Sequence, residues 1–340
     1  MADKSNINWC DSTFNGVIGC TKVSPACDNC YAEKERASTA LKVQWGAGKS
    51  RHRTSTDNWK KPIRWNKKPF CECEACGWRG EADWLGPCKS CGDLTLKQAR
   101  RRVFGYSLGD WLDNEIPIEW FVDQLDLIRR TPNLDWLLLT KRIGNWRSRL
   151  VAAKNYVSDK LGAEDPESDA LFDFIDLWLS GTSPAHVWLG ASVCKQTEVD
   201  RDITKLLSVP ASIHFLSIEP MLEAVDLNMS YGGLVEDDDG APYPGHVDWV
   251  ICGGESGPQA RPISPDWARS LRDQCAAAGV PFLYKQWGEW IPMLGQVPSV
   301  PVRDKTTTPD GWVVGRAGAK AAGRLLDGRK HNEFPTGASQ

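Results

Sequence analysis

The sequence of 340 residues is poor in histidine, in net charge and in long apolar runs. Its five histidines show no paired-ligand spacing, which disfavours a hydrolase that uses a divalent metal. A formal net charge of -3 gives no overall reason to bind nucleic acid or membranes, so any such binding must come from local patches. No apolar run approaches membrane-spanning length, and the polar start at Met1–Asn6 is unlike a signal peptide. We therefore expect a cytoplasmic protein that does not bind membranes.

Cysteine, in contrast, is abundant, with twelve residues in the chain. Because the cytoplasm is reducing, this number indicates metal binding rather than disulfide bonds. Cys20, Cys27 and Cys30 follow a C-x6-C-x2-C spacing, and no fourth cysteine or histidine is adjacent to them. Structural zinc normally takes four protein ligands, so three thiolates predict a metal centre with one open position where chemistry takes place.

A second group contains two copies of a C-x2-C-G knuckle, Cys73 with Cys76 and Cys88 with Cys91. Each pair can grip one ion from a tight turn, and the following glycine lets the backbone fold back. This pattern predicts a four-cysteine zinc ribbon, structural or substrate-gripping rather than catalytic, because four ligands close the coordination sphere. Cys71 is left over, as an alternative ligand or as no ligand at all.

The segment from Lys49 to Lys68 is basic and carries Trp59 and Trp65. Such a segment suits a nucleic-acid backbone with bases stacked on the indoles. It is equally typical of a solvated loop, since a run of charge by itself is weak evidence.

After the second cysteine group, short apolar runs alternate with helical patterns. Continuous apolar runs of this length predict buried parallel strands, and repeated β-then-α units indicate a barrel or a doubly wound sheet. Two segments, 151–184 and 226–246, interrupt the alternation and are expected to be peripheral insertions. The expected strands are 103–107, 135–140, 187–192, 214–218, 248–253 and 281–285, and the expected helices are 31–37, 118–129, 198–207 and 265–278.

Most of these strands are followed by polar or charged residues. One polar residue after a strand is usually just the start of a loop, but nearly every strand here has one. In barrels the active site gathers at the carboxyl ends of the strands, so this pattern favours a barrel with a site at that rim. The candidate residues are Asp110, Lys141, Arg142, Ser192, Glu219, Gly253, Gly254, Glu255 and Lys285.

Several motifs occur together and in order between about Trp9 and Trp290. With them, the chain resembles a phage-associated family of radical-SAM-like proteins that is named for its three-cysteine motif and was long carried as a domain of unknown function. The motifs are the three-cysteine stretch followed by Tyr31, and the segments 139–142, 188–193, 217–220, 253–257 and 285–288.

The resemblance implies an α/β fold, a partial (β/α) barrel of radical-SAM type with the four-cysteine zinc ribbon inserted. The barrel would comprise residues 1–70 and 97–295, the ribbon 71–96 and a C-terminal extension 296–340. Cys20, Cys27 and Cys30 would hold a 4Fe-4S cluster, whose open iron would bind S-adenosylmethionine. The larger radical-SAM superfamily uses C-x3-C-x2-C, so the first gap is longer here.

The resemblance also implies roles for the residues at the strand ends. Lys141, Arg142 and Lys285 would hold a carboxylate or phosphate as the catalytic set. The turn at Gly253 and Gly254 would bring backbone amides close to the cofactor. The cofactor ammonium or ribose hydroxyls would be held by Asp110, Ser192, Glu219 and Glu255.

The implied activity is a radical step on a modified base in phage DNA, for example conversion of an N-linked glycyl-thymine to a C-linked one. The implied partners are DNA or a modified nucleotide and an electron donor such as flavodoxin or ferredoxin. The alternative from a different class is a non-catalytic zinc-containing nucleic-acid-binding protein, in which both cysteine groups are structural.

Overall fold

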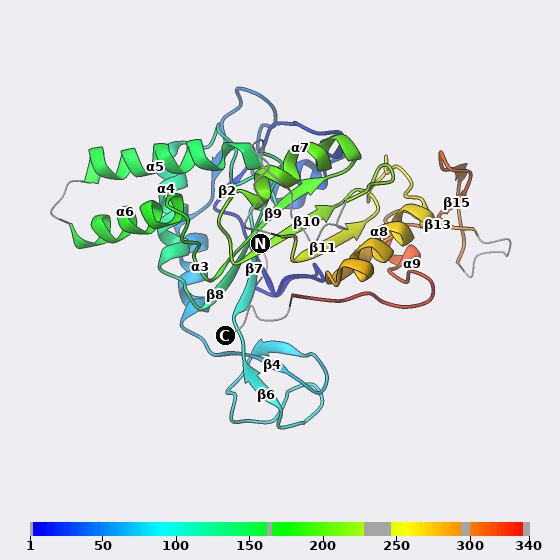
Figure 1. The fold of residues 1–340 in the computed structure, drawn as a ribbon, viewed down its shortest axis with the longest axis horizontal. Helices are drawn as coiled ribbons and strands as arrows, with labels where there is room; N and C mark the ends of the chain where they lie inside the picture. Colours follow the sequence, from blue (N-terminus) through cyan, green and yellow to red (C-terminus); the bar gives the residue numbers. More distant parts are fainter. Residues whose placement is uncertain (1–2, 162–164, 228–245, 294–299, 336–340) are drawn as a thin grey trace.

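The computed structural model describes residues 3–161, 165–227, 246–293 and 300–335, and its centre is a curled sheet of seven parallel strands (Figure 1). The spatial order of the strands follows the chain, so each connection leads to the neighbouring strand. The six expected strands are confirmed, while the first strand is only three residues long and carries no recognisable run. The strands are β1 (Ser12–Phe14), β7 (Arg101–Gly105), β8 (Leu134–Thr140), β9 (Val187–Val193), β10 (Ile213–Ile218), β11 (Trp249–Gly253) and β12 (Phe282–Gln286).

The helices of the described chain that pack on this sheet cover one of its two faces. In β8, for example, Trp136 and Leu138 join the core beneath the helices, whereas Leu137 and Leu139 face a second, smaller core on the inner side. A doubly wound sheet has helices on both faces, so this arrangement is that of a half-barrel. The helices are α3 (Thr56–Asn66), α4 (Ile118–Arg129), α5 (Trp146–Leu161), α6 (Pro166–Leu179), α7 (Gln196–Leu207) and α8 (Pro265–Ala278).

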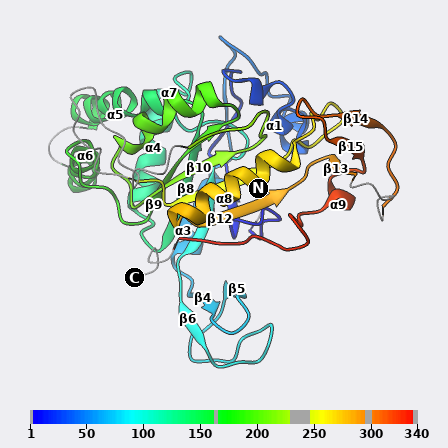
Figure 2. The same ribbon diagram turned by 45° about the vertical axis from the view of Figure 1, so that its right-hand side comes forward.

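Local signals explain where α8 begins and ends. The Ser264 hydroxyl accepts a hydrogen bond from the Asp266 amide at 3.2 Å, Pro265 occupies the first turn, and Gly279 ends the helix at a φ of +68°. These are the residue types that favour a helix start and a left-handed helix end. The helix therefore lies where the sequence predicts it, along β12 in Figure 2.

The segment 151–184 was expected to be a peripheral insertion, and this expectation is wrong. It forms most of an antiparallel hairpin of α5 and α6 between β8 and β9. Leu171, Ile175 and Trp178 of α6 are buried in the main core, and the Trp178 indole stacks on Trp111 with ring centroids 6.3 Å apart. Most of the other expected insertion, 226–246, lies outside the described residues.

The stretch Gly19–Tyr31, called the cysteine loop below, begins at the carboxyl end of the small strand that follows β1. The expected helix 31–37 is split into two short helices, because Glu35 takes an extended conformation with ψ of 144°. The elements here are β2 (Val17–Ile18), η1 (Pro25–Cys27), α1 (Tyr31–Lys34), α2 (Arg36–Ala40) and β3 (His52–Arg53).

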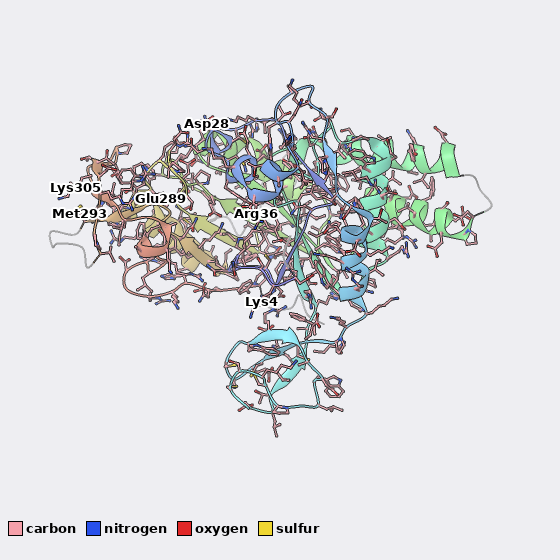
Figure 3. The ribbon with its side chains drawn as sticks, turned by 180° about the vertical axis from the view of Figure 1, so that it is seen from behind. Lys4, Asp28, Arg36, Glu289, Met293 and Lys305 are labelled. Atoms are coloured by element: carbon pink, nitrogen blue, oxygen red, sulfur yellow. The ribbon has the colours of Figure 1, made fainter. Side chains whose placement is uncertain are left out.

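The second cysteine group lies in a separate three-stranded antiparallel sheet at the amino ends of the barrel strands. Arg79 joins this sheet to the barrel through Asp11, which precedes β1, and through the carbonyl of Arg100, which precedes β7. Figure 3 shows Asp28 of the cysteine loop at the far end of the molecule from it. The strands are β4 (Phe70–Cys73), β5 (Arg79–Glu81) and β6 (Leu96–Gln98).

The C-terminal region returns to the sheet. Asn332 forms a bridge with Leu283 of β12, the Trp249 indole donates to the Glu333 carbonyl at 2.8 Å, and the Phe334 ring lies 4.9 Å from that of Trp249. The tail thus covers part of the inner core, which its sequence did not indicate. The remaining elements are η2 (Ile143–Asn145), β13 (Trp290–Pro292), β14 (Lys305–Thr307), β15 (Val313–Arg316) and α9 (Ala319–Ala322).

Candidate active site

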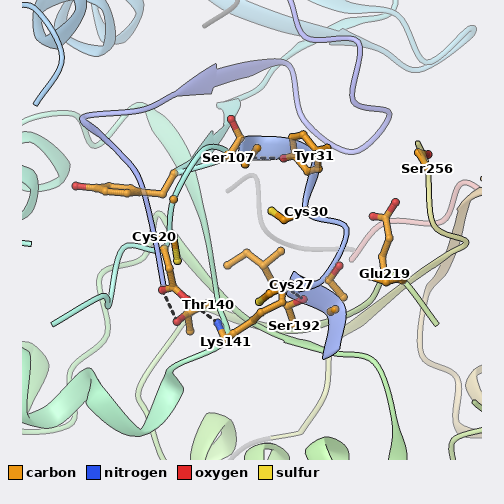
Figure 4. Close-up of a pocket in the computed structure, with 18 of the residues that line it drawn as sticks. Cys20, Cys27, Cys30, Tyr31, Ser107, Thr140, Lys141, Ser192, Glu219 and Ser256 are labelled. Carbon is orange, nitrogen blue, oxygen red and sulfur yellow. Dashed lines mark hydrogen bonds between the residues drawn. The ribbon is translucent and has the colours of Figure 1, made fainter. Parts of the chain in front are cut away.

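A cavity of about 330 Å³ lies at the carboxyl edge of the sheet, between the cysteine loop and the strand ends (Figure 4). This volume is at the lower end of the roughly 300–1,000 Å³ of ligand sites. The cavity brings together residues that are far apart in sequence. Of the residues predicted at the strand ends, all but Gly253 line it, namely Asp110, Lys141, Arg142, Ser192, Glu219, Gly254, Glu255 and Lys285, as do Cys20, Cys27 and Cys30.

The fold of the cysteine loop is set by local hydrogen bonds. Ser24 caps the short helix η1 by accepting from the Ala26 amide at 3.1 Å, and Pro25 occupies its first position. The Cys27 amide then donates to the Ser24 carbonyl at 2.9 Å, and Cys30 precedes α1. The short turn therefore holds Cys27 and Cys30 at fixed points of the cavity wall, with Cys20 on the segment that follows β2 (Figure 4).

Glu255 and Arg261 attach this loop to the end of β11. The Arg261 guanidinium binds both Glu255 oxygens, at 2.7 and 3.0 Å, and donates to the Pro25 carbonyl at 2.8 Å. Asn29 adds a hydrogen bond to Glu255 at 3.1 Å. Burial raises the pKa of Glu255, but the hydrogen bonds from Arg261 outweigh it and hold the pKa below its ordinary value. The carboxylate predicted to bind cofactor is thus bound mainly by Arg261 and, through Asn29, by the cysteine loop.

Arg142 reaches the same loop from the other side. Its Nη1 donates to Asp110 at 2.9 Å and to Cys20 Sγ at 3.3 Å, and its Nη2 donates to the Thr21 carbonyl. Burial raises the pKa of the Cys20 thiol to about 12, with Asp110 adding to the rise and Arg142 opposing it. Because this pKa already includes the effect of the neighbouring guanidinium, a thiolate at Cys20 depends on a bound metal.

Two lysines lie in the cavity with different partners. Lys285 forms an ion pair with Glu219 at 2.8 Å, and both side chains are mostly buried. Lys141 donates to the Ser192 hydroxyl at 2.8 Å, and the described residues place no carboxylate within ion-pair distance of its ammonium. Both lysines were predicted to hold an anionic group, and the freer one, Lys141, is the better placed to do so.

Close packing explains why glycines occupy the first two positions of the Gly253–Glu255 turn. A Cβ on Gly254 would lie 2.0 Å from the Trp287 carbonyl oxygen, and one on Gly253 would lie 3.2 Å from Glu219 Oε1. The first contact is impossible without moving backbone, so Gly254 permits two chain segments to approach each other. Its predicted contact with a cofactor stays a prediction.

Aromatic and aliphatic side chains close the inner side of the cavity. Trp9, Phe104 and Leu139 line it and belong to the inner core, and the rings of Trp9 and Phe104 are 4.4 Å apart. The Trp9 indole N–H is buried and has no hydrogen-bond partner among the described residues. The cavity therefore joins an apolar floor to a polar rim, a common design for ligand sites.

The two cysteine groups differ in the spacing of their sulfur atoms. Sulfurs around one tetrahedral zinc at about 2.3 Å are about 3.8 Å apart. In the second group the Cys73–Cys91 and Cys76–Cys88 pairs are each 3.7 Å apart, so these four cysteines are spaced to hold one metal ion. Cys71 is not among them, because its buried thiol donates to the Ala82 carbonyl.

Cys20, Cys27 and Cys30 are not gathered in this way. Over the described ranges, the second cysteine group is the one set of three or more His, Cys, Asp or Glu whose ligand atoms lie within 4.8 Å of one another. A cluster of several irons binds each cysteine to a different iron, so its sulfurs lie further apart than those around a single ion. The three sulfurs of the cysteine loop are therefore not spaced to bind one ion together.

In the basic segment 49–68 the two tryptophans and the first two arginines pack against the protein, whereas most of the cations are exposed, namely Lys49, Lys60, Arg64, Lys67 and Lys68. Arg51 is buried and paired with Asp113 at 2.8 Å, and Trp65 is buried in the main core. The Arg53 guanidinium lies 4.5 Å from the Trp59 ring. These contacts argue against base stacking on its indoles, and helix α3 occupies residues 56–66 in place of the solvated loop given as the alternative.

Sequence reasoning missed Arg261, Asn29 and Trp9 as parts of the site. Asn29 lies between two of the motif cysteines, and that position was the available signal. Arg261 lies six residues after Glu255 in an irregular segment, and only the folded chain brings it to Pro25. Trp9 precedes the first strand, where no pattern marks it.

A family model described as "Protein of unknown function (DUF5131)" matches residues 4–335. The match includes both the four-cysteine sheet and the C-terminal tail. No curated protein and no solved structure matches the chain. None of the helices within the described ranges has the length and apolar character needed to cross a membrane.

Proposed function

Since the chain belongs to the DUF5131 family of proteins of unknown function, its activity must be argued from the site, and we propose that it is a radical S-adenosylmethionine enzyme. The observation that carries the proposal is the position of three cysteines from one loop on the wall of a cavity, without the spacing of a single-ion site. Three protein thiolates leave one iron of a four-iron cluster open to a small ligand.

Cys20, Cys27 and Cys30 would be the ligands of this 4Fe-4S cluster. When bound there, S-adenosylmethionine would supply a 5′-deoxyadenosyl radical by reductive cleavage of a carbon–sulfur bond. The protein's own contribution is to hold the loop in place, through Glu255 and Arg261, and to enclose the reaction. Lys141 is the residue we assign to an anionic group in the cavity, because its ammonium contacts only a hydroxyl among the described side chains.

The substrate we propose is a modified nucleotide base, with the glycyl-thymine of phage DNA as the first candidate to test. The apolar floor formed by Trp9, Phe104 and Leu139 suits a flat ring. The four-cysteine sheet lies at the opposite end of the barrel strands, so we propose a structural zinc ribbon rather than a grip on substrate at the cavity.

The first experiment is metal analysis and visible spectroscopy of protein purified without oxygen and reconstituted with iron. We expect four irons with charge-transfer absorbance, and one zinc. Cys27→Ala should lose the iron and keep the zinc, whereas Cys275→Ala, a buried cysteine of α8, should keep both. Colourless protein with zinc at both groups would instead support a non-catalytic zinc protein.

The second experiment adds dithionite and S-adenosylmethionine to the reconstituted protein. The proposal requires 5′-deoxyadenosine, and its yield should rise when DNA or a nucleotide with the modified base is supplied. An iron-loaded protein that forms no 5′-deoxyadenosine would refute the proposed activity. A yield that no nucleotide changes would refute the substrate class alone.

A further inference from the structure

We propose that Arg142 sets the reduction potential of the metal centre on the cysteine loop, through its hydrogen bond to Cys20 Sγ. The inference rests on the proposed function, because it requires an iron–sulfur cluster on that loop. It replaces the sequence-based expectation that Arg142 holds a carboxylate or phosphate of a ligand. Arg142 thus becomes a positioning and tuning residue rather than a catalytic one.

The guanidinium is fixed in three directions. Its Nη1 lies 3.3 Å from Cys20 Sγ and 2.9 Å from Asp110 Oδ2, and its Nη2 donates to the Thr21 carbonyl. The Arg142 side chain is only 8% exposed. A buried guanidinium with these partners cannot turn towards a ligand in the cavity without leaving the Asp110 charge unpaired.

Asp110 is itself held rigidly. One of its oxygens accepts from the Thr140 hydroxyl at 2.6 Å and the Leu112 amide at 3.1 Å, and the other accepts from the Lys141 amide at 2.9 Å and from Arg142. With four donors around it, the carboxylate has little capacity left for a cofactor ammonium or ribose hydroxyl. Its role is to aim the Arg142 guanidinium at the sulfur.

Among the three cysteines of the loop, Cys20 differs from the others in its surroundings. Within the described part of the chain, the Cys20 sulfur accepts a hydrogen bond from an arginine, and the sulfurs of Cys27 and Cys30 do not. Figure 4 shows Cys20 beside Thr140 and Lys141, the residues that immediately precede Arg142 at the end of β8. The contact therefore joins the cluster loop directly to a strand end.

The direction of the effect follows from electrostatics. Reduction places one electron from an external reductant on the cluster and makes it more negative, with no bond formed or broken on the protein. A cation and an N–H donor at a ligand sulfur stabilise the more negative state, and burial strengthens the interaction. Arg142 should therefore raise the reduction potential and make the cluster easier to reduce.

The test is a redox titration of the reconstituted, full-length protein with dithionite, followed by visible absorbance and electron paramagnetic resonance. In Arg142→Gln we expect the reduction equilibrium to become about tenfold less favourable, a downward shift of about 59 mV for one electron. Arg142→Lys keeps the charge and should shift the potential less. Arg129→Gln, on the distal helix α4, removes the same charge from a surface ion pair and should leave the potential unchanged.

Each outcome decides the inference separately from the proposed function. If the wild-type protein itself binds no iron, the proposed function fails. If Arg142→Gln loads the cluster normally and keeps the wild-type potential, the tuning role is overturned. It is also overturned if Arg129→Gln shifts the potential by the same amount. It is overturned, too, if both Arg142 variants fold and keep zinc but no longer load iron, because Arg142 would then be needed to form the site rather than to set its potential.

Discussion

Replacing Arg261 by alanine should loosen the cysteine loop while leaving the barrel folded. Arg261 contacts the loop through the Pro25 carbonyl, at 2.8 Å, and through Asp28, at 3.2 Å. The Asp28 pair is largely exposed and contributes little. The hydrogen bond from a charged donor to Pro25 contributes about 1.5–2 kcal/mol to keeping the loop closed, after allowance for the partial exposure of Arg261.

This free energy can be measured by hydrogen exchange of the loop amides. A loss of about 1.5–2 kcal/mol corresponds to roughly 10- to 30-fold faster exchange if the loop opens locally. The reporters are the amides of Cys27, Asp28 and Cys30, which donate to carbonyls within the loop. Exchange should be followed by mass spectrometry on protein freed of iron, so that metal–sulfur bonds do not hold the loop.

Arg269→Ala provides the matched control. Arg269 binds Asp327 at 2.7 Å and Asp266 at 2.9 Å, and it lies on α8, where its removal breaks an ion pair of similar geometry without touching the loop. We expect wild-type exchange in the loop of this variant. Unchanged exchange in Arg261→Ala, or equal acceleration in both variants, would show that the Glu255–Arg261 pair does not anchor the loop.

Three further predictions concern stability and metal content. Cys76→Ser should release the zinc proposed for the four-cysteine group and leave the iron proposed for the cysteine loop in place, as measured by metal analysis, because the two groups lie at opposite ends of the strands. Gly254→Ala should lower the free energy of unfolding by about 3 kcal/mol, seen in the midpoint of thermal unfolding, because its Cβ would meet backbone. Burial raises the pKa of Asp135 from 3.8 to about 7, so its proton is lost on unfolding between these values and stability falls as pH rises through that window. Asp135→Asn should abolish this part of the pH dependence in denaturant titrations from pH 4 to 8, whereas an unchanged slope would assign it to other groups.

The periodic parts of the fold could be predicted from the sequence. Strands such as 187–192 are continuous apolar runs, and the helix 265–278 has a cap, a proline and a terminal glycine at the expected positions. Parts that depend on distant contacts could not. Nothing in the sequence of α6 marks Trp178 as the partner of Trp111, and the tail carries no pattern that assigns Phe334 to the inner core.

The sequence by itself determined which residues are candidates for the site. The two cysteine spacings and the polar residues after the strands are local patterns, and parallel strands necessarily bring their carboxyl ends to one edge. All but one of the predicted strand-end residues accordingly line one cavity with the cysteine loop.

Only the tertiary structure decided which partners these residues have. From the sequence alone we expected ligand binding by Asp110, Arg142 and Glu255. Charged side chains that become buried must find partners, however, and here those partners come from remote segments. Arg142 finds Asp110 and Cys20, and Glu255 finds Arg261 and Asn29. Lys141 has a hydroxyl as its partner, because no carboxylate of the described chain comes within ion-pair distance of it, and for this reason we assign it to a ligand.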